Sequence, residues 1–311
     1  MNRDTNEFRQ GIWYALACYG IWGLFPLYWY PLNHSAIPPD QILAQRVIWS
    51  ALFSVLLVVV TGQGKRLLSA MRRPRLLAAF AASAVLIGIN WLTYLWAIVN
   101  SHVLDASLGY FISPLANVLL GRLLFGERLG LLQWGAVGLA SIGILWLAVP
   151  AGQVPWVAML LALSFSLYGA VRKRAPLEAM PGMALETLVL LPFAAAWLLW
   201  ARQAGTLVFD ELSALQQAVL LGAGAATTVP LLCFAGAAHR IPLSMLGMLQ
   251  YFSPTLQLVL GLVLFNEQFS LQRLIGYGWV WAGVALFFGG MLLHTRQRRA
   301  PGQAAGRQRL S

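Results

Sequence analysis

Residues 113–127, SPLANVLLGRLLFGE, recur in similar form as residues 253–267, SPTLQLVLGLVLFNE. The two stretches align without a gap at an offset of 140 positions. Shared leucines are weak evidence for a repeat in such an apolar sequence, whereas Ser-Pro, Gly, Phe and Glu that coincide in one register are stronger evidence. The pattern therefore predicts two halves with the same architecture. The coincident pairs include Ser113/Ser253, Pro114/Pro254, Gly121/Gly261, Phe125/Phe265, Glu127/Glu267, Gly138/Gly278 and Gly143/Gly283.

The composition around this repeat is that of a membrane protein. The chain has 311 residues, of which 59% are hydrophobic and 10% charged, and its mean hydropathy is +0.70. Soluble proteins have about a quarter of their residues charged, so this composition excludes a cytosolic enzyme, a disordered protein and a secreted disulfide scaffold. Cys18 and Cys233 lie in apolar stretches and the four histidines are dispersed, so we expect no disulfide framework, metal site or cofactor.

Polar breaks divide the chain into ten apolar segments, each long enough to cross a hydrocarbon core of about 30 Å as a helix. We therefore predict an all-α integral membrane protein with ten transmembrane helices. They form two five-helix halves, residues 11–149 and 154–293, and a basic cytoplasmic tail at 294–311 follows. The ten segments are 11–31, 42–61, 76–99, 105–125, 131–149, 154–172, 182–201, 215–238, 242–265 and 271–293.

Lysine and arginine residues fall almost entirely in alternate loops, which predicts the orientation of the chain. Of the 21 cations, eighteen lie on one side, Arg202 and Arg273 lie on the other, and Arg46 lies inside a span. Both termini belong to the basic, cytoplasmic side. The net charge of +11 therefore indicates topology, and we expect no nucleic-acid partner. The eighteen are Arg3, Arg9, Lys65, Arg66, Arg72, Arg73, Arg75, Arg122, Arg128, Arg172, Lys173, Arg174, Arg240, Arg296, Arg298, Arg299, Arg307 and Arg309.

The repeat is predicted to be inverted. Because each half has five spans, the second half enters the membrane from the opposite side, which places Glu127 at the cytoplasmic face and Glu267 at the external face. Inverted repeats are a recurrent transporter design, since two mirror-related halves can present one site to each side in turn. The chain has no G-x-x-x-x-G-K-[ST] loop, so any energy input is expected to come from a gradient.

Short motifs run in order from the second span to the ninth and cover nearly the whole chain. They are QRVIWS at 45–50, NWL at 90–92 with WA at 96–97, ASLGYF at 106–111, YG at 168–169 with RK at 172–173, TTVPLL at 227–232, and QY at 250–251 with Pro254. In this order they resemble the EamA branch of the drug/metabolite transporter superfamily, and within it the RarD group, often labelled chloramphenicol-sensitive proteins. The resemblance implies a cytoplasmic-membrane permease that exports small metabolites or drugs.

Arg46 and Glu186 are the two ionisable residues that lie clearly within the predicted spans. Arg46 lies roughly 6 Å below the external end of the second span. It can snorkel to the interface, pair with Asp105, or bind a carboxylate or phosphate on a substrate. Glu186 lies similarly close to the cytoplasmic end of the seventh span. It is either a capping or loop-facing acid, which we favour, or a protonatable group that couples transport to protons. Their opposite depths argue against a direct Arg46–Glu186 salt bridge.

Uncharged polar and aromatic residues complete the predicted substrate pathway. Most polar groups at membrane depth, Thr227 among them, hold helices together, whereas deep aromatic rings can stack on a planar solute. Aromatics at span ends, such as Trp29, are most simply an interfacial belt. Prolines within spans are expected to kink their helices, and these are Pro114, Pro230 and Pro254. Besides Arg46, the predicted pathway residues are Asn90, Trp91, Tyr110, Asn117, Tyr168, Gln250 and Tyr251.

The sequence as a whole predicts a secondary transporter of a bacterial-type inner membrane rather than an enzyme. Its expected partners are a small-molecule substrate and the lipid bilayer. One alternative is an intramembrane lipid-modifying enzyme, which would need clustered acids or histidines near one face, whereas the acids here are scattered singly. The other is a non-transporting receptor or structural membrane protein, which usually carries a soluble domain. The substrate, the coupling ion and the oligomeric state are left open.

Overall fold

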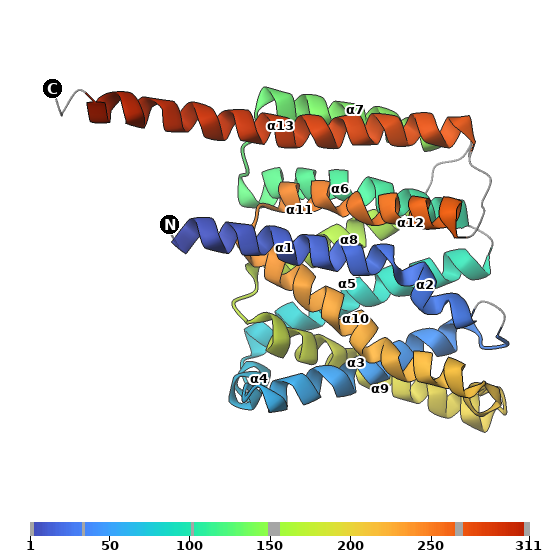
Figure 1. Cartoon of the computed structure of the whole chain (residues 1–311). Helices are drawn as coiled ribbons and strands as arrows, with labels where there is room; N and C mark the ends of the chain where they lie inside the picture. Colours follow the sequence, from blue (N-terminus) through green and yellow to red (C-terminus); the bar gives the residue numbers. More distant parts are fainter. Residues whose placement is uncertain (1–2, 33–34, 101–102, 149–155, 265–269, 308–311) are drawn as a thin grey trace.

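The computed structural model describes residues 3–32, 35–100, 103–148, 156–264 and 270–307. Within those ranges every regular element is a helix, and the long helices lie side by side with alternating directions (Figure 1). The elements are α1 (Arg3–Gly23), α2 (Phe25–Trp29), η1 (Tyr30–Leu32), α3 (Pro39–Val60), α4 (Gly64–Met71), α5 (Pro74–Val99), α6 (Val103–Phe125), α7 (Leu131–Ala148), α8 (Trp156–Arg174), α9 (Ala179–Gln203), η3 (Phe209–Glu211), α10 (Ala214–Arg240), α11 (Leu243–Gln250), α12 (Phe252–Val263) and α13 (Leu271–Arg307).

Within the described residues, helices are present in every segment that the sequence predicts to be a span. By length and composition, the described residues contain eight helices able to cross a membrane, with α11 and α12 counted as one. The two spans outside this set are α1, which begins with polar residues, and α8, which ends in three cations at 172–174. The protein is therefore an all-helical, multi-pass membrane protein.

Breaks in the helices differ in part from the expected kinks. The ninth predicted span is interrupted at Tyr251, between α11 and α12 and three residues before Pro254. In contrast, α6 and α10 run without interruption through Pro114 and Pro230, and α9 contains a further proline, Pro192. At the chain end, α13 continues as one helix to Arg307, through most of the segment predicted to be a tail. Figure 1 shows it extending beyond the bundle.

The core of the bundle surrounds α8, which packs against α5, α6, α10 and α11. Eleven residues of this helix are buried, although its hydropathy is modest. The ring of Tyr168 stacks on Phe234 of α10 at a centroid distance of 5.8 Å. Phe165, one turn earlier, contacts Phe234 and Trp22 of α1 at 5.2 and 5.5 Å. These aromatic contacts join helices from both halves of the chain.

Four pairs of corresponding helices, α3/α9, α5/α10, α6/α11 and α7/α13, begin at the offset of the sequence repeat, whereas α1 and α8 begin 153 positions apart. The contacts among these helices are also reciprocal: α3 packs on α9, α6 on α11 and α7 on α13, while α1 packs on α10 as α8 packs on α5. Each of these contacts therefore either has a counterpart of the same kind or joins two corresponding helices, whereas the contact of α8 with α10 has no counterpart of similar extent between α1 and α5. For example, the first residues of the two helices are Pro39 and Ala179 for α3 and α9, Pro74 and Ala214 for α5 and α10, and Leu131 and Leu271 for α7 and α13.

Two repeat-related glycines set the close approach of α7 and α13. A Cβ atom on Gly143 would lie 2.7 Å from the carbonyl oxygen of Gly276, and a Cβ atom on Gly283 would lie 2.7 Å from the carbonyl oxygen of Ala136. Both the glycines and their carbonyl partners are 140 positions apart. Each of the two helices therefore contributes one glycine and one carbonyl oxygen to the same kind of contact. Small residues are needed there because the backbones of the two helices approach each other closely.

We expect Gly283→Ala to destabilise the protein by about 1–3 kcal/mol, because the added methyl group overpacks the α7–α13 contact. Gly278→Ala on the same helix is the matched control, since nothing lies within 4 Å of a Cβ there. That variant should be neutral or slightly stabilising, because alanine favours helix over glycine. Thermal unfolding of the purified variants in detergent measures both effects. Equal melting temperatures for the two variants would contradict this packing.

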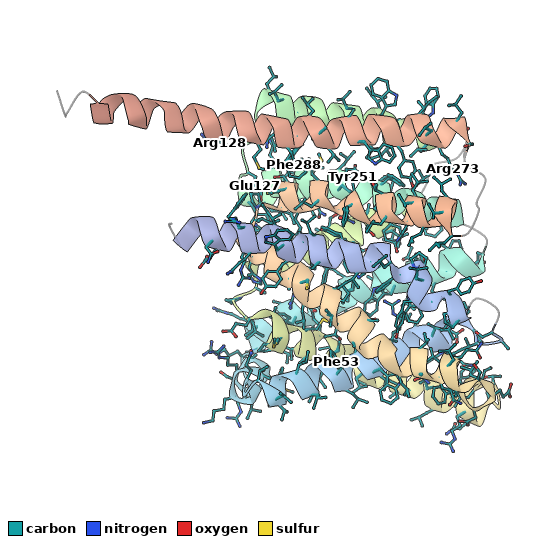
Figure 2. All side chains as sticks on the ribbon, viewed as in Figure 1. Phe53, Glu127, Arg128, Tyr251, Arg273 and Phe288 are labelled. Carbon is teal, nitrogen blue, oxygen red and sulfur yellow. The ribbon has the colours of Figure 1, made fainter. Side chains whose placement is uncertain are left out.

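The end of the bundle at which α4 lies carries a group of five cations, because Lys65, Arg66, Arg72, Arg73 and Arg75 lie in α4 or directly after it. Helix α1 begins and α13 ends at the end where α4 lies (Figure 1), here named the α4 end. Glu127 and Arg128 lie at this end, whereas Arg273 lies at the opposite, far end (Figure 2). An exposed ion pair between Arg66 of α4 and Glu178, just before α9, belongs to the α4 end. Glu127 accepts hydrogen bonds from the backbone N–H groups of Leu243 and Ser244 and so caps α11.

Candidate functional site

Arg46 lies inside the bundle on the half of α3 nearer the far end. It is the eighth residue of the helix, about 10 Å from its start, and thus deeper than the sequence suggests. Its Nε donates a hydrogen bond to Oγ1 of Thr227 on α10 at 3.3 Å. The guanidinium carbon lies 5.6 Å from the ring centroid of Trp29 and 5.0 Å from that of Trp91. Such contacts with indole rings stabilise a cation.

Three tyrosines complete the Arg46 cluster, which comprises Arg46, Thr227, the two tryptophans and these tyrosines. The rings of Tyr94 on α5 and Tyr110 on α6 meet edge to face with centroids 6.0 Å apart. Both, together with Tyr28, interact electrostatically with Arg46. Tyr94 is 37% exposed and Tyr110 44% exposed, so the cluster is accessible. Among the side chains that the structure describes, no carboxylate pairs with Arg46, and Asp105 lies outside that set.

Glu186 forms a second, closed cluster nearer the α4 end. One carboxylate oxygen accepts hydrogen bonds from the hydroxyl of Ser83 and, at 3.4 Å, from the guanidinium of Arg172. The other accepts a hydrogen bond from the hydroxyl of Tyr168 at 3.4 Å. Arg172 also lies over the ring of Phe80 at 5.3 Å. The side chains of Arg172 and Glu186 are 1% and 2% exposed, so the Glu186 cluster is a buried ion pair with hydrogen-bonded neighbours.

Two predictions about this region are wrong. The sequence places Arg172 in a basic cytoplasmic loop, but the structure buries it inside the bundle. It also favours Glu186 as a capping or loop-facing acid, whereas Glu186 is the eighth residue of α9 and its carboxylate faces α5 and α8. The helical spacing from Tyr168 to Arg172 is the signal that could have found the pair, because residues four apart share a helix face. The adjacent cations at 173–174 obscured it.

The two clusters are related by the repeat. Arg46 and Glu186 are 140 positions apart, and each is the eighth residue of its helix, α3 or α9. Tyr28 and Tyr168 are also 140 positions apart, and each lies beside one of these charges. The two helices pack against each other and begin at opposite ends of the bundle (Figure 1). The Arg46 cluster and the Glu186 cluster therefore lie at matching depths from opposite ends.

The remaining predicted pathway residues mostly join helices. The side-chain amide of Asn90 donates to the carbonyl oxygen of Leu161 at 2.9 Å and to Ser164 at 3.1 Å, which links α5 to α8. The amide of Asn117 on α6 donates to Gln250 on α11 at 3.1 Å. Tyr251 donates its hydroxyl hydrogen to the carbonyl oxygen of Phe111 at 3.1 Å, and Figure 2 shows it within the bundle. The Tyr251 hydroxyl and the amide nitrogens of Asn90 and Asn117 therefore hold helices together, while the buried Oδ1 of Asn117 has no hydrogen-bond partner among the described residues.

The structure thus gathers only part of the predicted pathway around Arg46. Trp91 and Tyr110 belong to the Arg46 cluster, Tyr168 belongs to the Glu186 cluster, and the other four lie at helix contacts. Sequence reasoning missed four members of the Arg46 cluster, namely Tyr28, Trp29, Tyr94 and Thr227. It assigned Trp29 to an interfacial belt and Thr227 to helix packing, because the distance between α2, α3 and α10 in space is not visible along the chain.

Comparison with known proteins agrees with this architecture. Residues 9–149 match the EamA-like transporter family. The chain is 43% identical to an uncharacterized transporter of Pseudomonas aeruginosa over 91% of this chain and 94% of that protein. It is 42% identical to Protein RarD of Escherichia coli over 91% of this chain and 95% of that protein. A crystal structure with 18% identity shares the fold, with a TM-score of 0.68 over 89% of this chain and 96% of the other. The chain therefore belongs to the EamA/RarD family of membrane transporters in the drug/metabolite transporter superfamily.

Proposed function

We propose that the protein is a secondary-active permease of the cytoplasmic membrane that exports small metabolites or drugs by alternating access. On this proposal the chain crosses the membrane ten times with both termini in the cytoplasm. Its two inverted five-helix halves, 11–149 and 154–293, move relative to each other. The shared helix offset, the reciprocal helix contacts and the concentration of cations at the α4 end support this arrangement.

The proposal rests mainly on one observation, which is that the two clusters related by the repeat differ in their exposure. The Arg46 cluster includes half-exposed tyrosine rings, whereas the Glu186 cluster is almost fully buried. If the two halves have the same architecture, the state in which one cluster is open and the state in which the other is open differ little in free energy. The helix arrangement of one state is then close to that of the other after rotation about the pseudo-two-fold axis. The closed Glu186 cluster is then the inner gate, and the Arg46 cluster is the side of the pathway that is open.

Glu186 is also the candidate for coupling transport to protons. Its carboxylate lies in the inner gate and pairs with Arg172, so gaining a proton would weaken that pair and favour opening. A gradient of protons across the membrane would then bias the exchange between the two states. The described residues offer no second buried acid beside it.

We expect transport by Glu186→Gln to lose its dependence on an imposed pH gradient while exchange down a solute gradient continues, because an amide does not take up this proton. The double variant Arg172→Met/Glu186→Gln repeats the test without an unpaired buried cation. Glu178→Gln, at the exposed start of the same helix, is the matched control. Gradient dependence that is unchanged in both test variants would exclude Glu186 from coupling.

Flux measurements on the purified protein in liposomes test the proposed function itself. A panel of amino acids, other small metabolites and antibiotics should include solutes with time-dependent, saturable uptake that empty liposomes do not show. Saturation separates a permease from a leak, since a site with finite turnover reaches a maximum rate. Absence of saturable flux across the whole panel would favour a receptor or an enzyme instead.

A further inference from the structure

We infer that the Arg46 cluster binds the oxyanion of an organic acid, so that the transported solute carries a carboxylate or a phosphoryl group. This inference rests on the proposed transport function and specifies the chemistry of its substrate. The hydrogen bonds, ring contacts and exposure of the Arg46 cluster support it.

The hydrogen-bonding capacity of Arg46 is largely unused. A guanidinium has five N–H donors in a planar fork. Only Nε is engaged, by Thr227, and among the described residues neither terminal nitrogen donates to a protein acceptor. The two terminal nitrogens present parallel N–H groups on one edge, which is the geometry that pairs with two oxygens of a carboxylate or phosphate. The cluster therefore offers a bidentate anion site.

Trp29 and Trp91 help to define how a ligand can approach. Both rings lie within 6 Å of the guanidinium carbon, which is close enough to cover its faces. With the Nε side bound to Thr227, the edge formed by the terminal nitrogens is left for a ligand. A planar cation held in this way selects an oxyanion rather than a neutral amide, because the amide lacks the second acceptor and the charge.

Arg46 differs from Glu186, the residue at the corresponding position of the other half, in having no counter-ion among the described residues. Glu186 has Arg172 as its counter-ion, whereas no carboxylate among the described side chains pairs with Arg46. Charged groups at membrane depth normally pair with one another or face a cavity. The half-exposed rings of Tyr94 and Tyr110 show that the Arg46 cluster is open at its surface, and tyrosine hydroxyl groups are further hydrogen-bond donors for an anion. An incoming oxyanion would supply the missing negative charge.

Thermal shift of the purified full-length protein with three matched probes tests this inference. The probes are benzoate, phenylphosphonate and benzamide, which share a ring and differ in the polar group. We expect benzoate, phenylphosphonate or both to raise the melting temperature in a saturable manner, because ligand binding stabilises the native state, and benzamide to leave it unchanged. The relative effect of the two anions identifies whether the site prefers a carboxylate or a phosphoryl group.

Variants at Arg46 assign the effect to this site. Arg46→Gln should abolish the anion-dependent shift, and Arg46→Lys should weaken binding at least about tenfold, because a lysine cannot form the bidentate pair. Arg202→Gln, an exposed cation near the far end, should behave as the wild type. No shift with either anion, an equal shift with benzamide, or an anion shift that survives Arg46→Gln would overturn the inference.

Failure of this inference is distinguishable from failure of the proposed function. If the anions bind through Arg46 but no solute shows saturable flux in liposomes, the site exists and the transport proposal is wrong. If saturable flux is found only for neutral or cationic solutes, and Arg46→Gln leaves it unchanged, transport holds and the anion site is wrong. Each outcome therefore decides between the two statements.

Discussion

Replacing Arg46 with alanine is expected to reduce transport at least about 30-fold, equivalent to about 2 kcal/mol, while leaving the protein folded and inserted. The loss follows because the guanidinium supplies the charge and the paired donors of the Arg46 cluster. Stability should be unchanged or slightly higher. An unpaired cation at membrane depth costs at least about 2.5 kcal/mol near the bilayer centre, and its removal offsets the loss of contacts with the two indole rings.

The combination of lost flux and retained stability separates a functional role from a structural one. Flux into liposomes at equal protein density, together with the melting temperature in detergent, measures both properties. Arg202→Ala removes an exposed cation and should change neither. Wild-type flux in Arg46→Ala would remove this residue from the pathway, and a large drop in melting temperature would make it a structural residue instead.

Removing either partner of the Arg172–Glu186 pair is expected to have the opposite signature. Arg172→Met or Glu186→Gln should each destabilise the protein by about 3–5 kcal/mol, because the remaining charge is left buried without its counter-ion. The two side chains are 1% and 2% exposed, so water cannot replace the lost partner. For Arg172→Met, the hydroxyl groups of Ser83 and Tyr168 still bond the carboxylate and reduce the effect, but they carry no charge.

The double variant Arg172→Met/Glu186→Gln should recover most of this stability, because no buried charge remains. A double-mutant cycle on unfolding free energies then gives the coupling energy of the pair. An exposed ion pair serves as the control: Arg66→Met and Glu178→Gln, singly or together, should change stability by less than about 1 kcal/mol. Additive effects of the two buried substitutions would contradict the ion pair.

Much of the fold follows from the sequence because local rules govern it. Apolar length predicted where helices occur, and the register of Ser113-Pro114 with Ser253-Pro254 predicted the offset at which four of the five pairs of corresponding helices begin. The glycine pair Gly143/Gly283 proved to lie at a reciprocal helix contact, which shows why glycine recurs there.

The composition of the site could be predicted only in part, because it depends on which helices meet in space. Arg46 is recognisable as a lone cation in an apolar span, and Trp91 as a deep aromatic. Arg172 is not, since cations at 172–174 look alike along the chain and only tertiary packing turns one of them inward. From the sequence, Trp29 is likewise interpreted as an interfacial residue. In the structure the chain turns after α1, and Trp29 at the end of α2 contacts Arg46 of α3.

Accessibility of one residue in the Arg46 cluster and of one residue beside the Glu186 cluster tests alternating access most directly. In a background with Cys18 and Cys233 replaced by alanine, Tyr94→Cys reports on the Arg46 cluster, and Met183→Cys, one turn before Glu186, reports on the inner gate. A membrane-impermeant maleimide should label Tyr94→Cys from outside and leave the buried Met183→Cys unlabelled from inside. Addition of a transported solute should lower the first rate and raise the second. Labelling rates that stay fixed, or that rise together at both positions, would contradict the account.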